Sequence, residues 1–169
     1  MPVVTPADLL LLHISTSKSA VISAIPTGGG RYPFPIVQLM QQVVVDRLLL
    51  AGEHLRAGDH LLFSAQYRSA ISRHYYAMYH AARAIVYAEN RGDDYERHNV
   101  LSRNLPSRLS DSATRESELT DARLLRNQAD YDAYPLNETE WENDARSLAI
   151  TAASFLQCCE SFASTNGYI

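Results

Sequence analysis

Lysine is nearly absent from this chain. Of 15 Lys and Arg residues, only Lys18 is a lysine, so arginine is the default cation. Twelve of the fourteen arginines lie between Arg47 and Arg126. The net charge is −4, which argues against a surface that coats nucleic acid broadly. A motif that rests on one arginine is therefore less surprising here than in an average sequence.

Cysteine is also scarce, and its placement excludes a disulfide framework. Cys158 and Cys159 are adjacent, so on a helix they point in different directions and cannot join distant parts of the chain. This use of cysteine fits a reducing compartment. The chain lacks His-Glu-x-x-His and Cys-x-x-Cys patterns, and we predict no metal site and no cofactor. With 169 residues it can bury a core without either.

No apolar run approaches the length that crosses a membrane, which is roughly 20 residues. The apolar stretch Leu9–Ile14 follows Asp8, whereas a signal peptide carries basic residues before its apolar run. These absences predict a cytoplasmic protein with no membrane partner.

The stretch Ile71–Asn90 contains no Gly or Pro and is typical of a long helix. One face of it is an apolar seam, and its residues recur at three- and four-residue steps: Ile71, Tyr75, Met78, Ala82 and Ile85. A neighbouring face is polar and carries Arg73, Tyr76, His80, Arg83 and Tyr87. Such a face must be solvated, paired with acids, or directed at a ligand or a second subunit.

The rest of the chain predicts further helices with short connections. We expect an N-terminal extension over residues 1–35 with one short helix, in which Val21–Ile25 is alternatively a short strand. The predicted helical domain spans residues 36–165, with helices over 36–57, 64–91, 98–109, 116–131 and 137–162. Pro106 should bend or break the third of these. The fold class is all-α, an antiparallel bundle of four to five helices.

Two segments of the chain resemble the HEPN superfamily (higher eukaryotes and prokaryotes nucleotide-binding domain). The run from Ser72 to Ala82, SRHYYAMYHAA, is similar to the second-helix signature of a branch with an SR-x-YYA-x-x-HAA pattern. Downstream, the run from Arg126 to Tyr131, RNQADY, is similar to the R-x-x-ADY motif of that branch. The resemblance implies an HEPN-like bundle over roughly residues 40–160. It also implies a homodimer that brings two motifs together.

Ribonucleases of this superfamily carry an arginine followed four to six residues later by a histidine, and need no metal. In this sequence Asp130, Tyr131 and Asp132 occupy those positions. The resemblance therefore points to Arg126, with His80 or Tyr131 as a substitute proton acceptor. RNA or nucleotide contacts would come from Arg73, Tyr76, Arg83, Asn127 and Asp130. The structural alternative is that Arg73, His80 and Asp130 form a buried polar network, or that Arg126 pairs with Asp130 within the helix.

The resemblance implies a component of a toxin–antitoxin or defence-type system that binds RNA or nucleotides. Its partner would be a minimal nucleotidyltransferase antitoxin that modifies Tyr131 or Tyr134. One alternative is a non-catalytic helical adaptor or a substrate-binding partner of such an enzyme. Another is an active metal-independent endoribonuclease that uses Arg126 and His80. Because no histidine follows Arg126, we predict weak cleavage or none by the protein alone.

Overall fold

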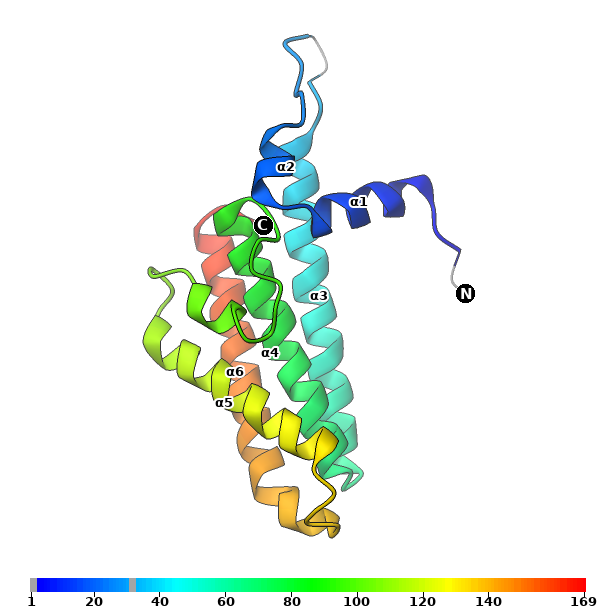
Figure 1. Cartoon of the computed structure of the whole chain (residues 1–169), viewed down its shortest axis with the longest axis vertical. Helices are drawn as coiled ribbons and strands as arrows, with labels where there is room; N and C mark the ends of the chain where they lie inside the picture. The colour runs from blue at the N-terminus through cyan, green and yellow to red at the C-terminus, as the bar shows by residue number, and fades with distance from the viewer. Residues whose placement is uncertain (1–2, 31–32) are drawn as a thin grey trace.

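The computed structural model describes residues 3–30 and 33–169. The predicted extension, residues 1–35, includes positions 1, 2, 31 and 32, which lie outside the described residues. Three long helices run side by side, namely α3 (Ile36–Phe63), α4 (Tyr67–Asn90) and α6 (Glu142–Thr165), and α5 (Ser112–Tyr131) crosses them (Figure 1). The described part of the chain contains helices and no β-strand, which confirms the predicted all-α bundle.

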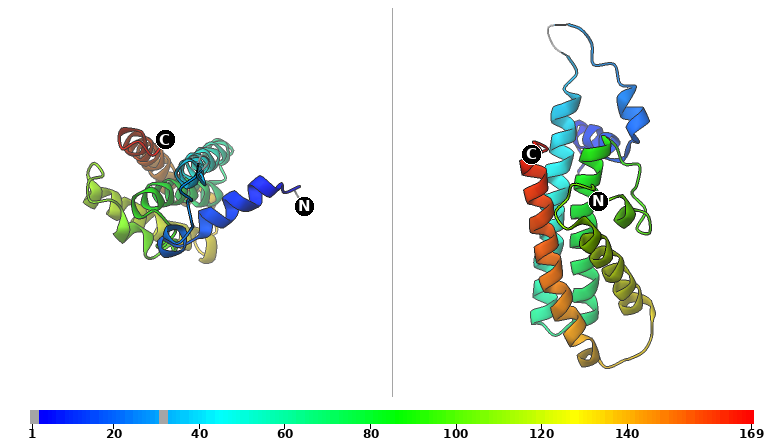
Figure 2. Two further views of the ribbon diagram at one scale, coloured as in Figure 1. Left: turned by 90° about the horizontal axis from the view of Figure 1, so that it is seen from above. Right: turned by 90° about the vertical axis from the view of Figure 1, so that its left-hand side faces the viewer.

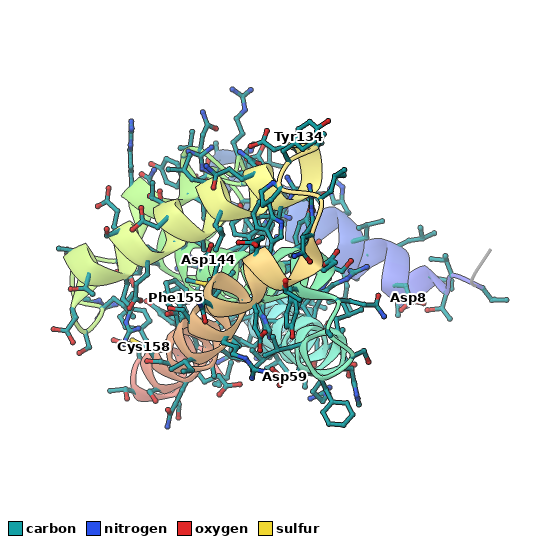
Figure 3. All side chains as sticks on the ribbon, turned by 90° about the horizontal axis from the view of Figure 1, so that it is seen from below. Asp8, Asp59, Tyr134, Asp144, Phe155 and Cys158 are labelled. Atoms are coloured by element: carbon teal, nitrogen blue, oxygen red, sulfur yellow. The ribbon has the colours of Figure 1, made fainter. Side chains whose placement is uncertain are left out.

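Helix α4 is the centre of the bundle and packs against α3, α5 and α6. Every residue of the predicted apolar seam is at most 1% exposed. Ala77, Ala81 and Ala84 are fully buried as well, so the small side chains let the neighbouring helices approach closely. Figure 2 shows α4 between its neighbours from two further directions, and in Figure 3 the buried Phe155 of α6 lies among the helices. The helix predicted as central is therefore the core of the fold.

The first long helix was predicted to end at residue 57, but α3 continues through Gly58 and ends at Phe63. The absence of a side chain at Gly58 lets α3 pack closely against α4, because a Cβ atom at position 58 would lie 2.5 Å from Cδ2 of His74 on α4. His74 is 0% exposed, and its Nε2 lies 3.0 Å from the Asp59 carboxylate. The buried ring of His74 thus occupies the space that a side chain at position 58 would need.

Gly58→Ala is expected to destabilise the protein by about 1–3 kcal/mol, because the new methyl group overpacks against a ring with nowhere to move. At this chain length that corresponds to a loss of roughly 2–10 °C in melting temperature. Gly52→Ala on the same helix is the matched control: its nearest neighbour would be Arg56 Nη1 at 3.6 Å, and helix propensity should make it neutral or stabilising. Equal melting temperatures for the two variants would contradict this account.

The predicted helix over residues 98–109 is wrong. The segment contains only one 3₁₀ turn, η1 (Leu101–Asn104), and is otherwise loop before α5 begins at Ser112. Pro106 is buried where the loop passes the bundle and cannot donate a backbone hydrogen bond. The extended loop leaves the side chains that follow α4 free to turn toward α5.

The N-terminal region forms two helices, α1 (Pro6–Thr16) and α2 (Ser19–Ser23), where one helix or a strand was predicted. A capping box fixes the start of α1, because the Thr5 hydroxyl accepts from the backbone N–H of Asp8 while Asp8 accepts from Thr5. Ile14 and Ile22 are buried in the same core as the bundle helices. The amino-terminal end of α1 projects from the bundle (Figure 1).

A buried acid fastens this region to the bundle. Asp93, directly after α4, is 4% exposed and lies 3.2 Å from Arg47 Nη2 and 2.9 Å from Arg83 Nε. Its backbone N–H donates to the carbonyl of Ser17 at 2.8 Å. The neighbouring Gly92 admits no side chain, because a Cβ atom there would lie 2.1 Å from the Ser19 nitrogen. The α1–α2 junction is thus locked onto the end of α4.

The last helix was predicted over residues 137–162, and α6 begins five residues later, at Glu142. The Asn137 side chain accepts from the backbone N–H of Thr139 at 3.2 Å, and a 3₁₀ turn, η2 (Glu138–Trp141), leads into α6. Trp141 is 6% exposed, and its Nε1 donates to the carbonyl of Pro135 at 3.1 Å. Among the helices of the described ranges, none is both long and apolar enough to cross a membrane.

Candidate functional site

Arg126 lies near the end of α5 and reaches across to α4. Its Nη2 donates to the Tyr76 hydroxyl at 2.8 Å, and its guanidinium lies over the rings of Tyr76 and Tyr131, at 5.3 and 5.4 Å from their centroids. Its Nε lies 2.7 Å from the Asp130 carboxylate, four residues on. The polar face of α4 and the downstream motif therefore meet at Arg126.

A groove of about 410 Å³ opens beside this arginine, and we call it the Arg126 groove. It is lined by Tyr75, Arg97, His98, Asn99, Arg123, Arg126, Asn127 and Tyr131. Three of these residues are arginines and none is acidic. The groove is therefore a cationic depression with hydrogen-bond donors and aromatic rings, although the whole chain is acidic.

His98 is a member of this groove that the sequence analysis missed. Its Nδ1 is hydrogen-bonded to the Tyr75 hydroxyl at 2.5 Å. Its ring stacks on Tyr79, with centroids 4.1 Å apart and planes at 20°. Nothing in the sequence spacing points to it, because it follows α4 in an irregular loop and is 28 positions from Arg126. Only the return of that loop toward α5 places an imidazole beside the motif arginine.

The surroundings keep this imidazole neutral. Burial lowers the pKa of His98, and the positive charges of Arg126, Arg83 and Arg123 lower it further. Burial raises the pKa of Tyr75, so its hydroxyl stays protonated, and its oxygen can accept a hydrogen bond from Nδ1–H of His98. In that tautomer the lone pair of Nε2 is left to accept a proton from a ligand.

His80 does not line the Arg126 groove. It lines a separate groove of about 390 Å³ with Arg47, Arg83 and side chains of α1. Its ring stacks on His54 at 5.1 Å, and burial first and then the nearby charge of His54 lower the pKa of His80 to about 4. Tyr76 lies between the two grooves, with its ring centroid 6.4 Å from that of His80.

The structure thus gathers some of the predicted site residues and separates others. Arg126, Asn127 and Tyr131 line one groove, and Tyr76 and Asp130 contact Arg126 from its sides. Arg83 is engaged by Asp93 and is not available to a phosphate. Arg73 is exposed, with its Nη1 3.5 Å from His54 Nδ1.

The suggested buried network of Arg73, His80 and Asp130 does not form. Asp130 is exposed, pairs with Arg126 and accepts a 3.4 Å hydrogen bond from the Ser72 hydroxyl. The buried network of the protein is instead that of Asp93 with Arg47 and Arg83. Within residues 3–30 and 33–169, no three His, Cys, Asp or Glu side chains are grouped as a metal site.

The free energy of unfolding is expected to decrease as the pH is lowered from about 7 to about 5. Burial is the main cause that lowers the pKa of His54, His74, His80 and His98 in the folded protein. The unfolded chain, with histidine pKa values near 6.5, therefore binds more protons below that pH, and acid favours unfolding. Since several of these rings are partly exposed, we expect a loss of about 1–3 kcal/mol.

Thermal melts at the two pH values measure this effect. His80→Gln should flatten the pH dependence, whereas His60→Gln, at an exposed position of α3, should leave it unchanged. A melting temperature at about pH 5 equal to that at about pH 7 would contradict the prediction.

The chain belongs to the HEPN domain family, whose pattern matches residues 44–162. The match covers α4, the loop with His98, α5 and most of α6, so the Arg126 groove lies wholly within it. No curated protein and no solved structure matches the chain.

Proposed function

We propose that this HEPN-domain protein binds RNA through the Arg126 groove, as a component of a toxin–antitoxin or defence-type system in the cytoplasm. The observation that carries the proposal is the convergence of Arg97, Arg123 and Arg126 on one groove without an acidic lining residue. Guanidinium groups bind phosphate oxygens in a bidentate manner, and three of them suit a chain of phosphates better than one isolated anion.

Aromatic side chains support single-stranded RNA as the ligand. Tyr131 is 74% exposed at the edge of the groove. Any of the four RNA bases can stack on such a ring, so this contact does not require a particular RNA sequence. Asn127 adds an amide that can donate to a base or a phosphate. The site is local, which reconciles RNA binding with a net charge of −4.

Arg126→Gln and Arg123→Gln are each expected to weaken binding of a short single-stranded RNA by about 10-fold, since each removes one phosphate contact. Each should also reduce the salt dependence of binding by about one charge. Fluorescence anisotropy across a salt series measures both effects. Arg56→Gln is the control, because this exposed arginine of α3 pairs with Glu53 outside the groove. Equal RNA affinity in all variants would refute the proposed site.

A second candidate function is metal-independent RNA cleavage, and His98 is the observation that favours it. A base accepts the proton of the 2′-hydroxyl, the 2′-oxygen attacks phosphorus, and the leaving 5′-oxygen takes up a proton. Arg126 would stabilise the charge on the phosphate, and the neutral imidazole of His98 in the same groove would move the proton. His80, the imidazole considered from the sequence, lines another groove.

A third candidate is an adaptor that associates with a minimal nucleotidyltransferase. Tyr131 and Tyr134 are 74% and 75% exposed, so a partner enzyme can reach either hydroxyl, and Tyr134 lies at the outer edge of the molecule in Figure 3. A small nucleotidyltransferase gene beside this one would favour this candidate.

We also propose a homodimer that pairs two Arg126 grooves, which light scattering over a concentration series would detect.

A further inference from the structure

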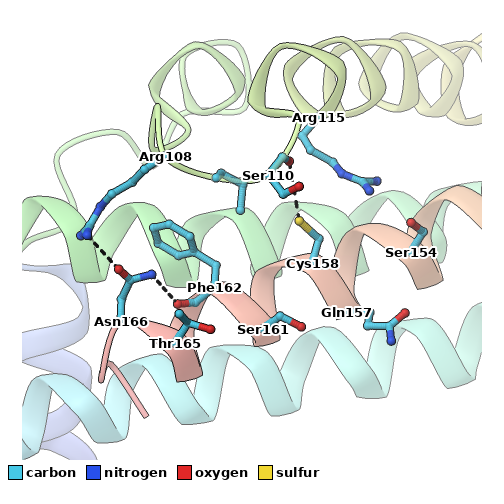
Figure 4. A pocket seen from close by; sticks show the side chains of 11 residues that line it. Arg108, Ser110, Arg115, Ser154, Gln157, Cys158, Ser161, Phe162, Thr165 and Asn166 are labelled. Carbon is cyan, nitrogen blue, oxygen red and sulfur yellow. Dashed lines mark hydrogen bonds between the residues drawn. The ribbon is translucent and has the colours of Figure 1, made fainter.

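Another polar groove, of about 460 Å³, lies between the loop before α5 and the carboxyl-terminal half of α6 (Figure 4). We call it the Arg115 groove. It shares no lining residue with the Arg126 groove. Arg115 and Arg126 are eleven residues apart on one helix, about 16 Å along its axis. The proposed RNA site does not account for this groove.

The lining of the Arg115 groove is rich in hydrogen-bond donors. Hydroxyls come from Ser110, Ser154, Ser161 and Thr165, amides from Gln157 and Asn166, and guanidinium groups from Arg108 and Arg115. No carboxylate lines it. A concave surface with many donors and no carboxylate among its lining residues is suited to an anion with several oxygens.

Arg115 is the lining residue whose bonding is incomplete. Its side chain is 16% exposed, and its Nη1 donates to Glu118 at 2.8 Å, which holds the guanidinium in place. Its Nε is fully buried and has no hydrogen-bond partner. Because Nε is buried, a ligand in the groove would contact the terminal nitrogens of the guanidinium, of which Nη1 is bonded to Glu118.

Arg108, in contrast, already has its partners. It donates to Glu89, to the Asn166 side chain and to the Tyr168 hydroxyl, at distances between 2.8 and 3.3 Å. Its guanidinium also lies over the Phe162 ring, 5.6 Å from the centroid. Arg108 therefore shapes one end of the groove with its charge balanced by Glu89, and the direct contact falls to Arg115, whose ion pair with Glu118 engages Nη1.

We propose that the Arg115 groove binds a phosphoryl group, held by Arg115 and by hydroxyls of α6. The volume admits either inorganic phosphate or a nucleoside monophosphate whose remainder lies along α6. Both sources present the same dianionic oxygens. Adenosine, which lacks the phosphate, separates recognition of the phosphoryl group from recognition of the nucleoside.

The protein contains a reporter for this site. Cys158 lines the groove and is partly exposed, with its Sγ 3.9 Å from the Ser110 carbonyl, whereas the other cysteine, Cys159, is buried. Inorganic phosphate at about 20 mM, at constant ionic strength with chloride, should slow alkylation of Cys158 by at least about 3-fold. Adenosine 5′-monophosphate should protect at lower concentration if the nucleoside also makes contacts, and adenosine should not protect.

Arg115→Gln should weaken phosphate binding by about 10- to 100-fold and abolish the protection of Cys158. Arg146→Gln is the matched control on α6, because that exposed arginine pairs with Glu142 outside the groove and should retain full protection. Ser154→Ala, a smaller change, should weaken binding by about 3- to 10-fold and keeps the test decisive if Arg115→Gln unfolds. The proposal is overturned if phosphate gives no protection, or if both groove variants keep wild-type protection.

Discussion

Asp93→Ala is expected to destabilise the protein by about 3–5 kcal/mol, the largest effect of any single substitution outside the apolar core. The carboxylate is 4% exposed and lies between Arg47 and Arg83, and Arg47 itself is 8% exposed. Without Asp93 the buried guanidinium of Arg47 and the partly buried one of Arg83 lose their shared carboxylate. Burial already lowers the pKa of Arg47 even with the carboxylate present. The backbone hydrogen bonds of position 93 to Ser17 and Lys18 remain possible in the variant, so the expected loss comes from the carboxylate.

Urea denaturation of wild type and variant measures the loss. Glu53→Ala is the control, because its ion pair with Arg56 is exposed and should change stability by less than about 0.5 kcal/mol. Asp93→Asn keeps the shape of the side chain and some of its hydrogen bonds. Its loss of stability should therefore lie between the losses of Asp93→Ala and Glu53→Ala. A loss below about 1 kcal/mol for Asp93→Ala would show that water or a rearranged acid compensates the arginines.

His98→Gln is expected to lower metal-independent RNA cleavage by about 10²- to 10⁴-fold while RNA binding stays within a few-fold of wild type. Glutamine can keep a hydrogen bond to Tyr75 but cannot take up or release the proton. Arg126→Ala should lose both cleavage and binding, because its guanidinium is the phosphate contact nearest the motif. Gel assays with single-stranded RNA in EDTA, beside anisotropy measurements, separate the two losses.

His80→Gln distinguishes this assignment from the one the sequence suggested. It should keep the cleavage rate, since His80 lines a different groove, and His60→Gln is a surface control. The opposite outcome is that His80→Gln loses cleavage and His98→Gln retains it, with unchanged melting temperatures. That result would show that His80, and not His98, transfers the proton. Wild-type protein that binds RNA without cleaving it would leave the Arg126 groove a binding site and favour the adaptor function.

The fold was largely predictable because its strongest signals are local in the sequence. The three- and four-residue periodicity of Ile71, Met78 and Ile85 marks a helix face wherever that helix packs, and all three are fully buried. The predicted last helix over 137–162 overlaps α6, which begins at Glu142 after a 3₁₀ turn capped by Asn137. The errors arose where packing overrides local preference. Gly58 lies inside α3 because a ring of α4 needs its space, and the segment after His98 is extended rather than helical.

The sequence by itself determined the all-α class, the central helix, and the placement of Arg126, Asn127 and Tyr131 within two turns of one helix, because they lie at most five positions apart. Only the tertiary structure decided which imidazole joins them, which arginines are free, and what holds the N-terminal helices. His98 reaches Arg126 through a loop, and Asp93 binds Arg47 across 46 positions. Such contacts join segments that are distant in the sequence. The periodicity within one segment predicts which face of a helix is buried, but not which distant residue contacts it.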